Sequence, residues 1–273
     1  MYFTIGVINS DGEVTILSVS RTNPYSLLNN SRFYILAASL LMSALIVGLL
    51  RIHIPSDQLF VIRTQQVFGL LCLIYWYVAL AISPIGHIVG KQRMKRVEFT
   101  RRAIGVSAFY FAFLHTIIAL WGQLGGLGQL QHLPTLFQWS LAGGFVALII
   151  LGIMAVTSFD RIVRFMTYRK WKWLHRLVYA AFTLVVLHVW SVGTHLAYSE
   201  IQIVSFVLLL LLSGLELFKV IKVANGKYLH LSKVEIVTLF VASWACIAAL
   251  IISIPVVVQN YHSRHTEHSQ EQQ

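Results

Sequence analysis

Long apolar runs, separated by short polar and basic segments, dominate the hydrophobicity pattern of this sequence. A helix needs about 20 mostly apolar residues to cross the hydrocarbon core of a bilayer. Seven runs approach or exceed that length, and they cover residues 33–50, 67–88, 103–122, 138–157, 173–193, 201–218 and 235–258. The pattern therefore predicts an all-α membrane protein with about seven spanning helices.

The two ends of the chain lack this pattern. Residues 1–32 alternate in part between apolar and polar positions and contain Asp11-Gly12, a dipeptide typical of hairpin turns. We expect a cytoplasmic extension there, with a short β-hairpin. The tail over residues 259–273 is polar and rich in histidine, which is typical of a disordered segment. Between them we expect a membrane core over residues 33–222, then an extra spanning helix with its preceding loop over residues 223–258.

Composition agrees with a membrane protein. Hydrophobic residues make up 57% of the 273 residues and charged residues only 11%, whereas soluble domains carry roughly a quarter of charged residues. The net charge of +11 is no sign of nucleic-acid binding, because the basic residues gather in loops and no nucleic-acid motif accompanies them. Cys72 and Cys246 lie in apolar runs and form neither a disulfide pattern nor a metal-binding spacing. The expected surroundings are a lipid bilayer.

The basic loops predict the orientation of the helices. Residues 91–102 hold six lysines and arginines, residues 160–172 hold five, and further lysines follow the sixth run. The alternate loops are almost uncharged, with Glu200 as the one charged residue in 122–138 and 194–200. Because basic loops stay in the cytoplasm, we expect a multi-pass plasma (inner) membrane protein with its N-terminus inside. With seven spans the C-terminus lies outside.

Histidines inside the apolar runs are the main chemical signal. An ionisable side chain in hydrocarbon is costly and usually marks a functional site, although a histidine bonded to a neighbouring helix is the alternative at any single position. His115 in the third run and His188 in the fifth lie at a similar outward depth, on two helices that run in the same direction. His175 lies about 20 Å below His188, at the cytoplasmic end of the same run.

Two neutral imidazoles at equal depth can hold one haem iron from both faces without any cysteine. No CxxCH motif is present, so such a haem would be a non-covalent haem b. Zinc is the alternative, but structural zinc takes four ligands and catalytic zinc three plus water. His175 and His188 differ by thirteen residues, or roughly 220° of helical rotation. Either this helix is distorted, or the two histidines face different sides.

An ordered set of motifs resembles a known family. RR-x-x-G precedes His115, T-S and a basic loop follow the fourth run, and W-x-x-LHRLVY and LH-x-W contain His175 and His188. Together they resemble the ferric reductase-like transmembrane domain, and most of all the bacterial MsrQ (YedZ) type of haem b membrane subunit. The resemblance covers residues 67–193 well, and residues 33–66 and 194–220 loosely. It implies a six-helix haem-binding bundle, to which the seventh run would be an addition.

The resemblance also implies roles for individual residues. His115 and His188 correspond to the axial pair of an outer haem, and His175 to a ligand of a second haem on the cytoplasmic side. Where related oxidases have the partner of that second ligand, this chain has Arg101, which stays protonated and cannot bind iron. Three arginines are expected to hold a haem propionate or a flavin phosphate instead: Arg101, Arg102 and Arg176. One haem or two, and FMN or quinone at the inner face, thus stay open.

Three other residues have simpler expectations. His87, at the inner end of the second run, is either an interfacial histidine or a replacement for the missing inner ligand. Trp171 is expected in the aromatic belt at the inner interface. Glu216 is expected to pair with Lys219 and Lys222 across one helical turn.

The expected function is transmembrane electron transfer through haem b. Only about 50 residues follow the sixth run and they contain no GxGxxG, so the flavin and nicotinamide domain of the larger relatives is not expected. Electrons would come from a separate cytoplasmic reductase or quinol donor and leave to an extracytoplasmic acceptor protein or metal. The alternatives are a stand-alone metalloreductase, suggested by the histidines of the tail, and a membrane anchor without redox chemistry.

Overall fold

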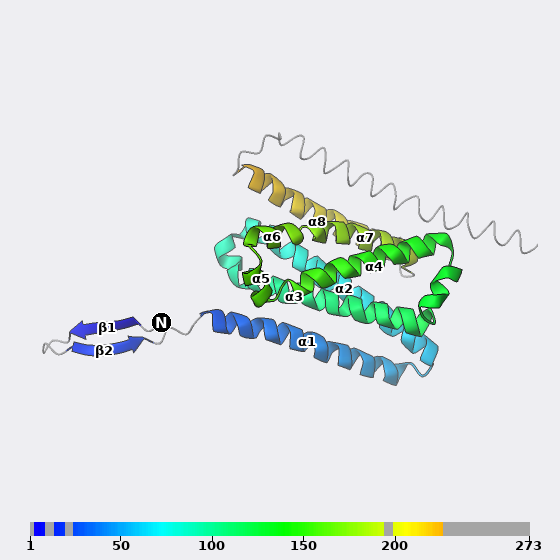
Figure 1. Cartoon of the computed structure of the whole chain (residues 1–273), viewed down its shortest axis with the longest axis horizontal. Coiled ribbons are helices and arrows are strands. Elements are labelled where there is room, and N and C mark those ends of the chain that lie inside the picture. Colours follow the sequence, from blue (N-terminus) through cyan, green and yellow to red (C-terminus); the bar gives the residue numbers. More distant parts are fainter. Residues whose placement is uncertain (1–2, 9–13, 20–23, 194–198, 226–273) are drawn as a thin grey trace, which may run out of the picture.

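The computed structural model describes residues 3–8, 14–19, 24–193 and 199–225. Two strands, β1 (Phe3–Ile8) and β2 (Val14–Val19), pair antiparallel with Phe3 opposite Val19 and Ile8 opposite Val14. The rest of the described chain is helical (Figure 1). Its long helices are α1 (Pro24–His53), α2 (Asp57–Val89), α3 (Lys91–Ile117), α4 (Thr135–Val156), α7 (Leu177–Val192) and α8 (Ser199–Asn225).

Short helical segments complete the chain. A π-helical segment, η1 (Ile118–Gln123), continues α3, and a 3-10 segment, η2 (Leu127–His132), leads towards α4. Two short helices, α5 (Asp160–Phe165) and α6 (Tyr168–Leu174), connect α4 to α7. These segments lie at the two ends of the bundle, where the chain passes from one long helix to the next (Figure 1).

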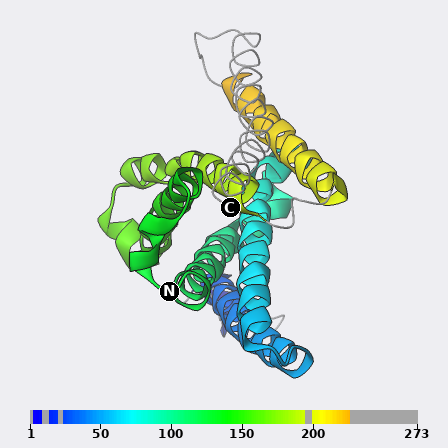
Figure 2. The same cartoon turned by 90° about the vertical axis from the view of Figure 1, so that its right-hand side faces the viewer.

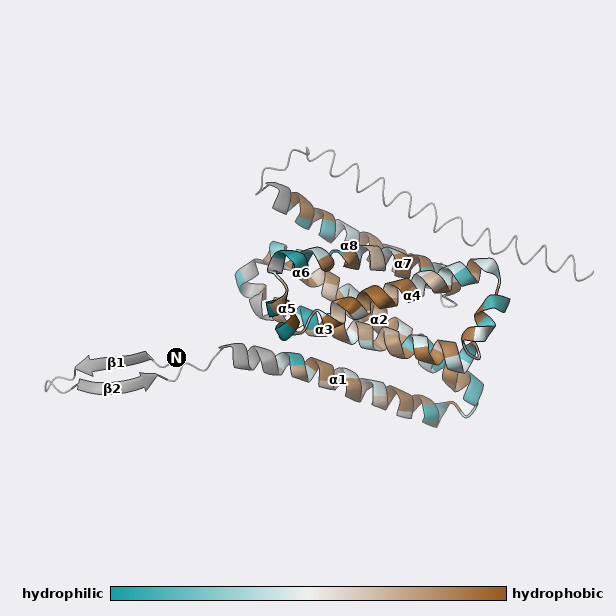
Figure 3. Ribbon diagram, in the orientation of Figure 1, coloured by the Kyte–Doolittle hydropathy of each residue, from teal (hydrophilic) through white to brown (hydrophobic). Residues whose placement is uncertain are grey.

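Within the described residues, six helical segments are long and apolar enough to cross a membrane, and they correspond to the first six predicted runs. They cover Ser31–His53, Asp57–Val89, Phe99–Gln123, Thr135–Val156, Arg169–Val192 and Gln202–Lys222. Figure 3 shows apolar residues along the length of these helices, as expected for surfaces that contact lipid. The predicted seventh span and the histidine-rich tail lie outside the described residues.

The basic segment over residues 91–102 is part of a helix, so its prediction as a loop was wrong. α2 ends at Val89, Gly90 follows with a φ of +107° that suits a glycine, and α3 begins at Lys91. The charged residues that follow are mostly lysine and arginine, which are good helix formers. α1 also begins earlier than its apolar run, at Pro24.

The fifth span is interrupted at His175. α6 ends at Leu174, His175 and Arg176 form a turn, and α7 begins at Leu177. The backbone N–H of Arg176 donates to the carbonyl of Trp173 at 3.1 Å, which tightens the chain at this point. Of the two alternatives left by the thirteen-residue spacing, the distorted helix is the one found here.

The helices pack as two pairs with flanking helices. α2 packs along α3, and α4 packs along α7, while α1 lies against α3 and α8 against α2. α1 and α8 therefore lie on opposite sides of the bundle, as both views show (Figures 1 and 2). Phe68, Trp76, Phe111 and Leu151 belong to the buried core where these helices meet. This arrangement places α2 directly beside α3, and α4 directly beside α7.

Buried hydroxyl groups hold α1 against the core. The Ser39 hydroxyl donates to Ser107 Oγ at 2.9 Å, and Ser43 Oγ and Tyr110 Oη share a hydrogen bond of 2.7 Å. Ser39 and Ser107 are both almost completely buried. Hydrogen bonds between helices stabilise membrane bundles because lipid offers no replacement partner.

Candidate functional site: an outer histidine pair and an inner histidine corner

His115 and His188 lie next to each other in space. His115 is in the last turn of α3 and His188 is near the end of α7. The centroids of their rings are 6.5 Å apart, and the ring planes form an angle of 84°. The structure therefore brings together the two histidines that the sequence places at equal depth on two helices.

Each ring is held by a backbone carbonyl of the helix packed beside its own. His115 Nδ1 lies 2.9 Å from the carbonyl oxygen of Gln65 on α2, and His188 Nδ1 lies 3.0 Å from the carbonyl oxygen of Ser140 on α4. A carbonyl oxygen only accepts, so each Nδ1 carries the proton and donates. In a neutral imidazole the lone pair then lies on Nε2. Neither Nε2 has a hydrogen-bond partner among the described residues.

This arrangement fits a metal ion held between the two rings. Histidine ligands commonly donate their second ring N–H to a carbonyl or carboxylate, which fixes the tautomer and the ring orientation. Two metal–nitrogen bonds of about 2 Å each would separate the Nε2 atoms by about 4 Å and the ring centroids by roughly 6 Å, close to the 6.5 Å found. No group of three or more candidate ligands (His, Cys, Asp or Glu) occurs in the described part of the chain. The pair thus fits the iron of a haem better than zinc.

His175 has different surroundings at the opposite end of the bundle, which the basic segments predict to be the cytoplasmic end. Its Nδ1 lies 3.1 Å from the carbonyl of Trp171, one turn earlier in its own segment, and so carries the proton. Its Nε2 is buried without a partner in the described residues. The rings of Trp171 and His175 are 4.1 Å apart and tilted by 32°. No second histidine ring is found against His175 in the described residues.

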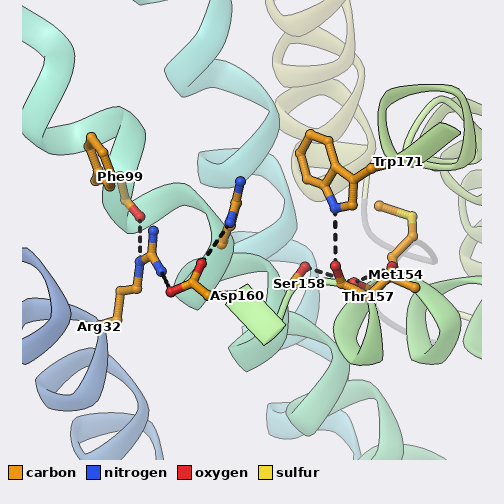
Figure 4. Close-up of polar contacts among 8 residues, drawn as sticks. Arg32, Phe99, Met154, Thr157, Ser158, Asp160 and Trp171 are labelled. Carbon is orange, nitrogen blue, oxygen red and sulfur yellow. Dashed lines mark hydrogen bonds and ion pairs between the residues drawn. The ribbon is translucent and has the colours of Figure 1, made fainter. Parts of the chain in front are cut away.

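Charged side chains lie around His175 and Trp171, which we call the inner corner. Asp160, at the start of α5, forms ion pairs with Arg32 of α1 at 2.9 Å and with Arg102 of α3 at 3.0 Å. The Arg102 guanidinium also lies 4.9 Å from the centre of the Trp171 ring. Arg32 donates further to the carbonyl of Phe99, which Figure 4 shows beside Asp160. One aspartate therefore joins three separate helices beside His175.

Trp171 is fixed on both sides. Its indole N–H donates to the carbonyl of Thr157 at 3.0 Å, at the end of α4 (Figure 4), and its ring lies against Arg102 and His175. The side chain thus makes specific polar and stacking contacts.

Arg101 and His87 make their hydrogen bonds with backbone carbonyls instead. Arg101 donates from Nε to the carbonyl of Ala79 on α2 at 2.8 Å, and the Arg176 side chain is exposed. His87 Nδ1 lies 2.9 Å from the carbonyl of Ser83 in its own helix. Of the three arginines expected at the inner site, Arg102 is the one that contacts the ring beside His175.

The pairing expected for Glu216 is found in part. Glu216 forms an ion pair with Lys219 and accepts a hydrogen bond of 3.0 Å from the Tyr179 hydroxyl of α7. Lys222 instead donates to the backbone carbonyl of His87 at the end of α2. These contacts tie α8 to α7 and α2 near the inner ends of all three helices.

The sequence reasoning missed the residues that support the histidines. Asp160 was noted only as the start of a basic loop, and its pairing with arginines of two other helices depends on the packing. The carbonyls of Gln65 and Ser140 have no sequence signal, because every residue has a carbonyl. A glycine inside an apolar span is also a weak signal of a residue that supports a histidine, since small residues are common wherever membrane helices pack closely.

Comparison with known proteins identifies the central part of the chain. The family described as "Ferric reductase like transmembrane component" matches residues 65–186. Residues 65–186 are thus similar to the transmembrane component of that family. The matched range includes His115 and His175 and ends two residues before His188. The resemblance predicted from the motifs is confirmed, and no solved structure matches the chain.

Curated relatives carry a haem-related name. The chain is 32% identical over 136 residues to the protein-methionine-sulfoxide reductase heme-binding subunit MsrQ of Ralstonia nicotianae, which covers 49% of this chain and 60% of that protein. It is 31% identical over 132 residues to MsrQ of Bordetella pertussis (48% and 60%), and 36% identical over 122 residues to MsrQ of Deinococcus radiodurans (45% and 58%). The chain thus spans about 60% of the length of these relatives.

Proposed function

We propose that this protein is a membrane electron-transfer subunit that binds one haem b between His115 and His188. The observation that carries the proposal is the opposed pair of imidazoles, 6.5 Å apart, each with its proton held on Nδ1 by a backbone carbonyl. A haem bound there would supply one-electron redox chemistry. The names of the curated relatives, which are heme-binding subunits, support the same cofactor.

The chain's own contribution is to prepare two lone pairs in a water-poor site. Because both Nδ1 atoms donate to carbonyls, both Nε2 atoms present a lone pair without any loss of a proton. The rings lie between α3 and α7, each with a further helix behind it, so they are partly buried and fixed before the cofactor binds. Such ordering lowers the free-energy cost of binding.

The inner corner is the proposed entry point for electrons. It lies at the basic ends of the helices, which the positive-inside rule places in the cytoplasm. Among the described residues His175 lacks a facing histidine, so we propose that a flavin or quinol donor docks here and not a second haem. The buried Nε2 of His175 would accept a hydrogen bond from a hydroxyl or N–H group of that donor.

The electron acceptor is proposed to lie outside the cytoplasm. His115 and His188 are at the ends of α3 and α7 opposite to the inner corner. The relatives are named as subunits of a methionine-sulfoxide reductase, which is consistent with a separate redox partner. We propose a redox protein as the acceptor.

The experiment is a spectrum of the purified full chain from cells supplied with haem. We expect a b-type spectrum that dithionite reduces, and about one haem per chain. His115→Ala and His188→Ala should each abolish it, whereas His132→Ala should not, because His132 lies in η2, outside the spanning helices. A colourless wild-type protein would contradict the proposed function. Two haems per chain would contradict the role given to His175.

A further inference from the structure

A glycine lies directly against each ring of the outer pair. A Cβ atom added to Gly69 would be 2.9 Å from Nδ1 of His115, and one added to Gly144 would be 2.9 Å from Nδ1 of His188. Non-bonded heavy atoms prefer separations of about 3.5–4.0 Å. Each imidazole therefore occupies the space that any larger residue would need for its side chain.

The two glycines have the same position relative to the carbonyls that hold the rings. Gly69 follows Gln65 by four residues on α2, and Gly144 follows Ser140 by four residues on α4. In an α-helix, residues four positions apart lie on the same face, one turn from each other. Each ring thus rests on a single helical turn that offers a carbonyl at its start and an open space at its end.

We propose that these two turns, Gln65–Gly69 and Ser140–Gly144, are matched cradles that position the axial ligands, with Gly69 and Gly144 as the positioning residues. This inference rests on the proposed role of His115 and His188 in binding haem. Each cradle fixes the tautomer through the carbonyl and the plane of the ring through the glycine. Together they hold the ring planes close to perpendicular, at 84°.

Two other glycines, Gly143 and Gly105, do not lie against a histidine ring. A Cβ on Gly143, next to Gly144 on α4, would meet only Leu184 Cδ2 at an ordinary 3.8 Å. A Cβ on Gly105, on the same helix as His115, would have nothing within 4 Å. The atoms closest to the added Cβ at Gly69 and Gly144 belong to the histidine rings, whereas at Gly122 and Gly152 they belong to Val61 and Phe109.

A methyl group at either position should displace the ring. The ring would have to turn or move outward, and its hydrogen bond to the carbonyl would lengthen or break. Loss of a hydrogen bond that supports a metal ligand typically lowers metal affinity by about 10- to 100-fold. We expect a loss of this size in haem affinity for Gly69→Ala and for Gly144→Ala.

The first test compares four variants of the full chain, purified from haem-supplied cells. Gly69→Ala and Gly144→Ala are the test variants, and Gly105→Ala and Gly143→Ala are their controls. The readouts are the haem affinity and the electron paramagnetic resonance spectrum of the oxidised protein. Nearly perpendicular imidazole planes produce a low-spin ferric signal with one unusually large g value. We expect this signal in the wild type and both controls, and a lower largest g value in the haem that the test variants retain.

A second measurement separates ring displacement from simple misfolding. Gly69→Ala is combined with His115→Ala, and thermal unfolding of the single and double variants is compared. If the added methyl collides with the ring, Gly69→Ala lowers the unfolding temperature in the wild type and has little effect once the ring is removed. An equal loss in both backgrounds would overturn the proposal.

The outcomes distinguish this inference from the proposed function. If the wild type has a bis-histidine spectrum but Gly144→Ala equals Gly143→Ala in haem affinity and g value, the cradle proposal is wrong and the proposed function stands. If the wild type binds no haem at all, the proposed function fails, and the positioning of haem ligands fails with it.

Discussion

The outer histidine pair and the inner histidine corner are held by different kinds of contact. At the outer pair, two backbone carbonyls and two glycines of neighbouring helices hold the rings. At the inner corner, His175 bonds to its own segment, and charged side chains join the surrounding helices through Asp160 and Glu216. Backbone contacts fix a ring within the packed bundle, whereas ion pairs between side chains tie helix ends together near the interface.

This difference suits different tasks. A ligand pair must be at the right separation before a cofactor binds, and contacts from rigid helices provide such precision. A docking site for a donor must reach the aqueous side, and the inner corner lies at a break between α6 and α7 with exposed residues beside it. The predictions below test whether the two regions respond independently.

Removing histidines should have the largest and most unequal effect. His188→Ala leaves one axial ligand, so we expect loss of the bis-histidine haem signal. His175→Ala should keep a full complement of haem and slow only the reduction of haem by a cytoplasmic donor. Haem-to-protein ratio and reduction kinetics measure the two effects. Equal loss of haem in both variants would show that the regions form one site.

Breaking the ion pair on α8 should destabilise the inner half of the bundle. Glu216 and Lys219 are both mostly buried, and removal of one partner from a buried pair costs about 3–5 kcal/mol because the other charge is left alone. We expect Glu216→Ala to lower the unfolding temperature markedly and Glu216→Ala with Lys219→Met to recover part of the loss. Thermal unfolding in detergent measures both changes in unfolding temperature. The outer haem signal of the folded fraction should not change.

Replacing the indole should affect the inner corner without unfolding it. Trp171→Phe removes the hydrogen bond to the Thr157 carbonyl and keeps an aromatic ring beside Arg102. The expected cost is about 1 kcal/mol. Trp171→Leu removes the ring as well and should slow electron entry further, because His175 loses its stacking partner. Reduction kinetics with unchanged haem content would support this order, and an identical effect of both variants would contradict it.

Neutralising Asp160 should have a modest effect, because this side chain is half exposed. Exposed ion pairs contribute roughly 0–1 kcal/mol each, and Asp160→Asn weakens two of them. Asp57→Asn is the matched control, since its pair with Arg51 at the outer end of the bundle is more exposed. We expect a small decrease in unfolding temperature for Asp160→Asn, reduced by high salt, and less for the control.

The smallest effect is expected from the hydroxyl contact of α1. Ser39→Ala removes the donor to Ser107, and hydrogen bonds of this kind in membrane bundles contribute about 0.6 kcal/mol on average. A decrease in stability of that order, with no change in haem content or reduction kinetics, would show that α1 supports both regions equally. A selective change at either region would contradict this.

Much of the architecture could be predicted from the sequence because hydrocarbon imposes a simple rule. Every run of sufficient length and low charge must form a helix, since lipid leaves no other partner for the backbone. The six described spans follow this rule. The rule does not apply outside the hydrocarbon, which is why residues 91–102 were wrongly predicted as a loop and α1 begins before its apolar run.

The sequence also predicted that His115 and His188 lie at the same depth in the membrane. This depth follows from counting residues along each helix, because the rise per residue is constant. It could not determine how either ring is held. That depends on which helix lies behind each ring, and only the packing of α2 on α3 and of α4 on α7 brings a carbonyl and a glycine to each histidine. For His175, the sequence allowed either a distorted helix or a different face, and the structure shows the interruption at that residue.

The sequence by itself therefore determined the membrane class, the six described spans and the equal depth of the two outer histidines, because these depend on composition and on distance along a helix. The tertiary structure alone decided the tautomers of the rings, their mutual angle and the pairing of Asp160 with two distant arginines. Those features arise from contacts between helices, and such contacts depend on which faces meet when the bundle packs.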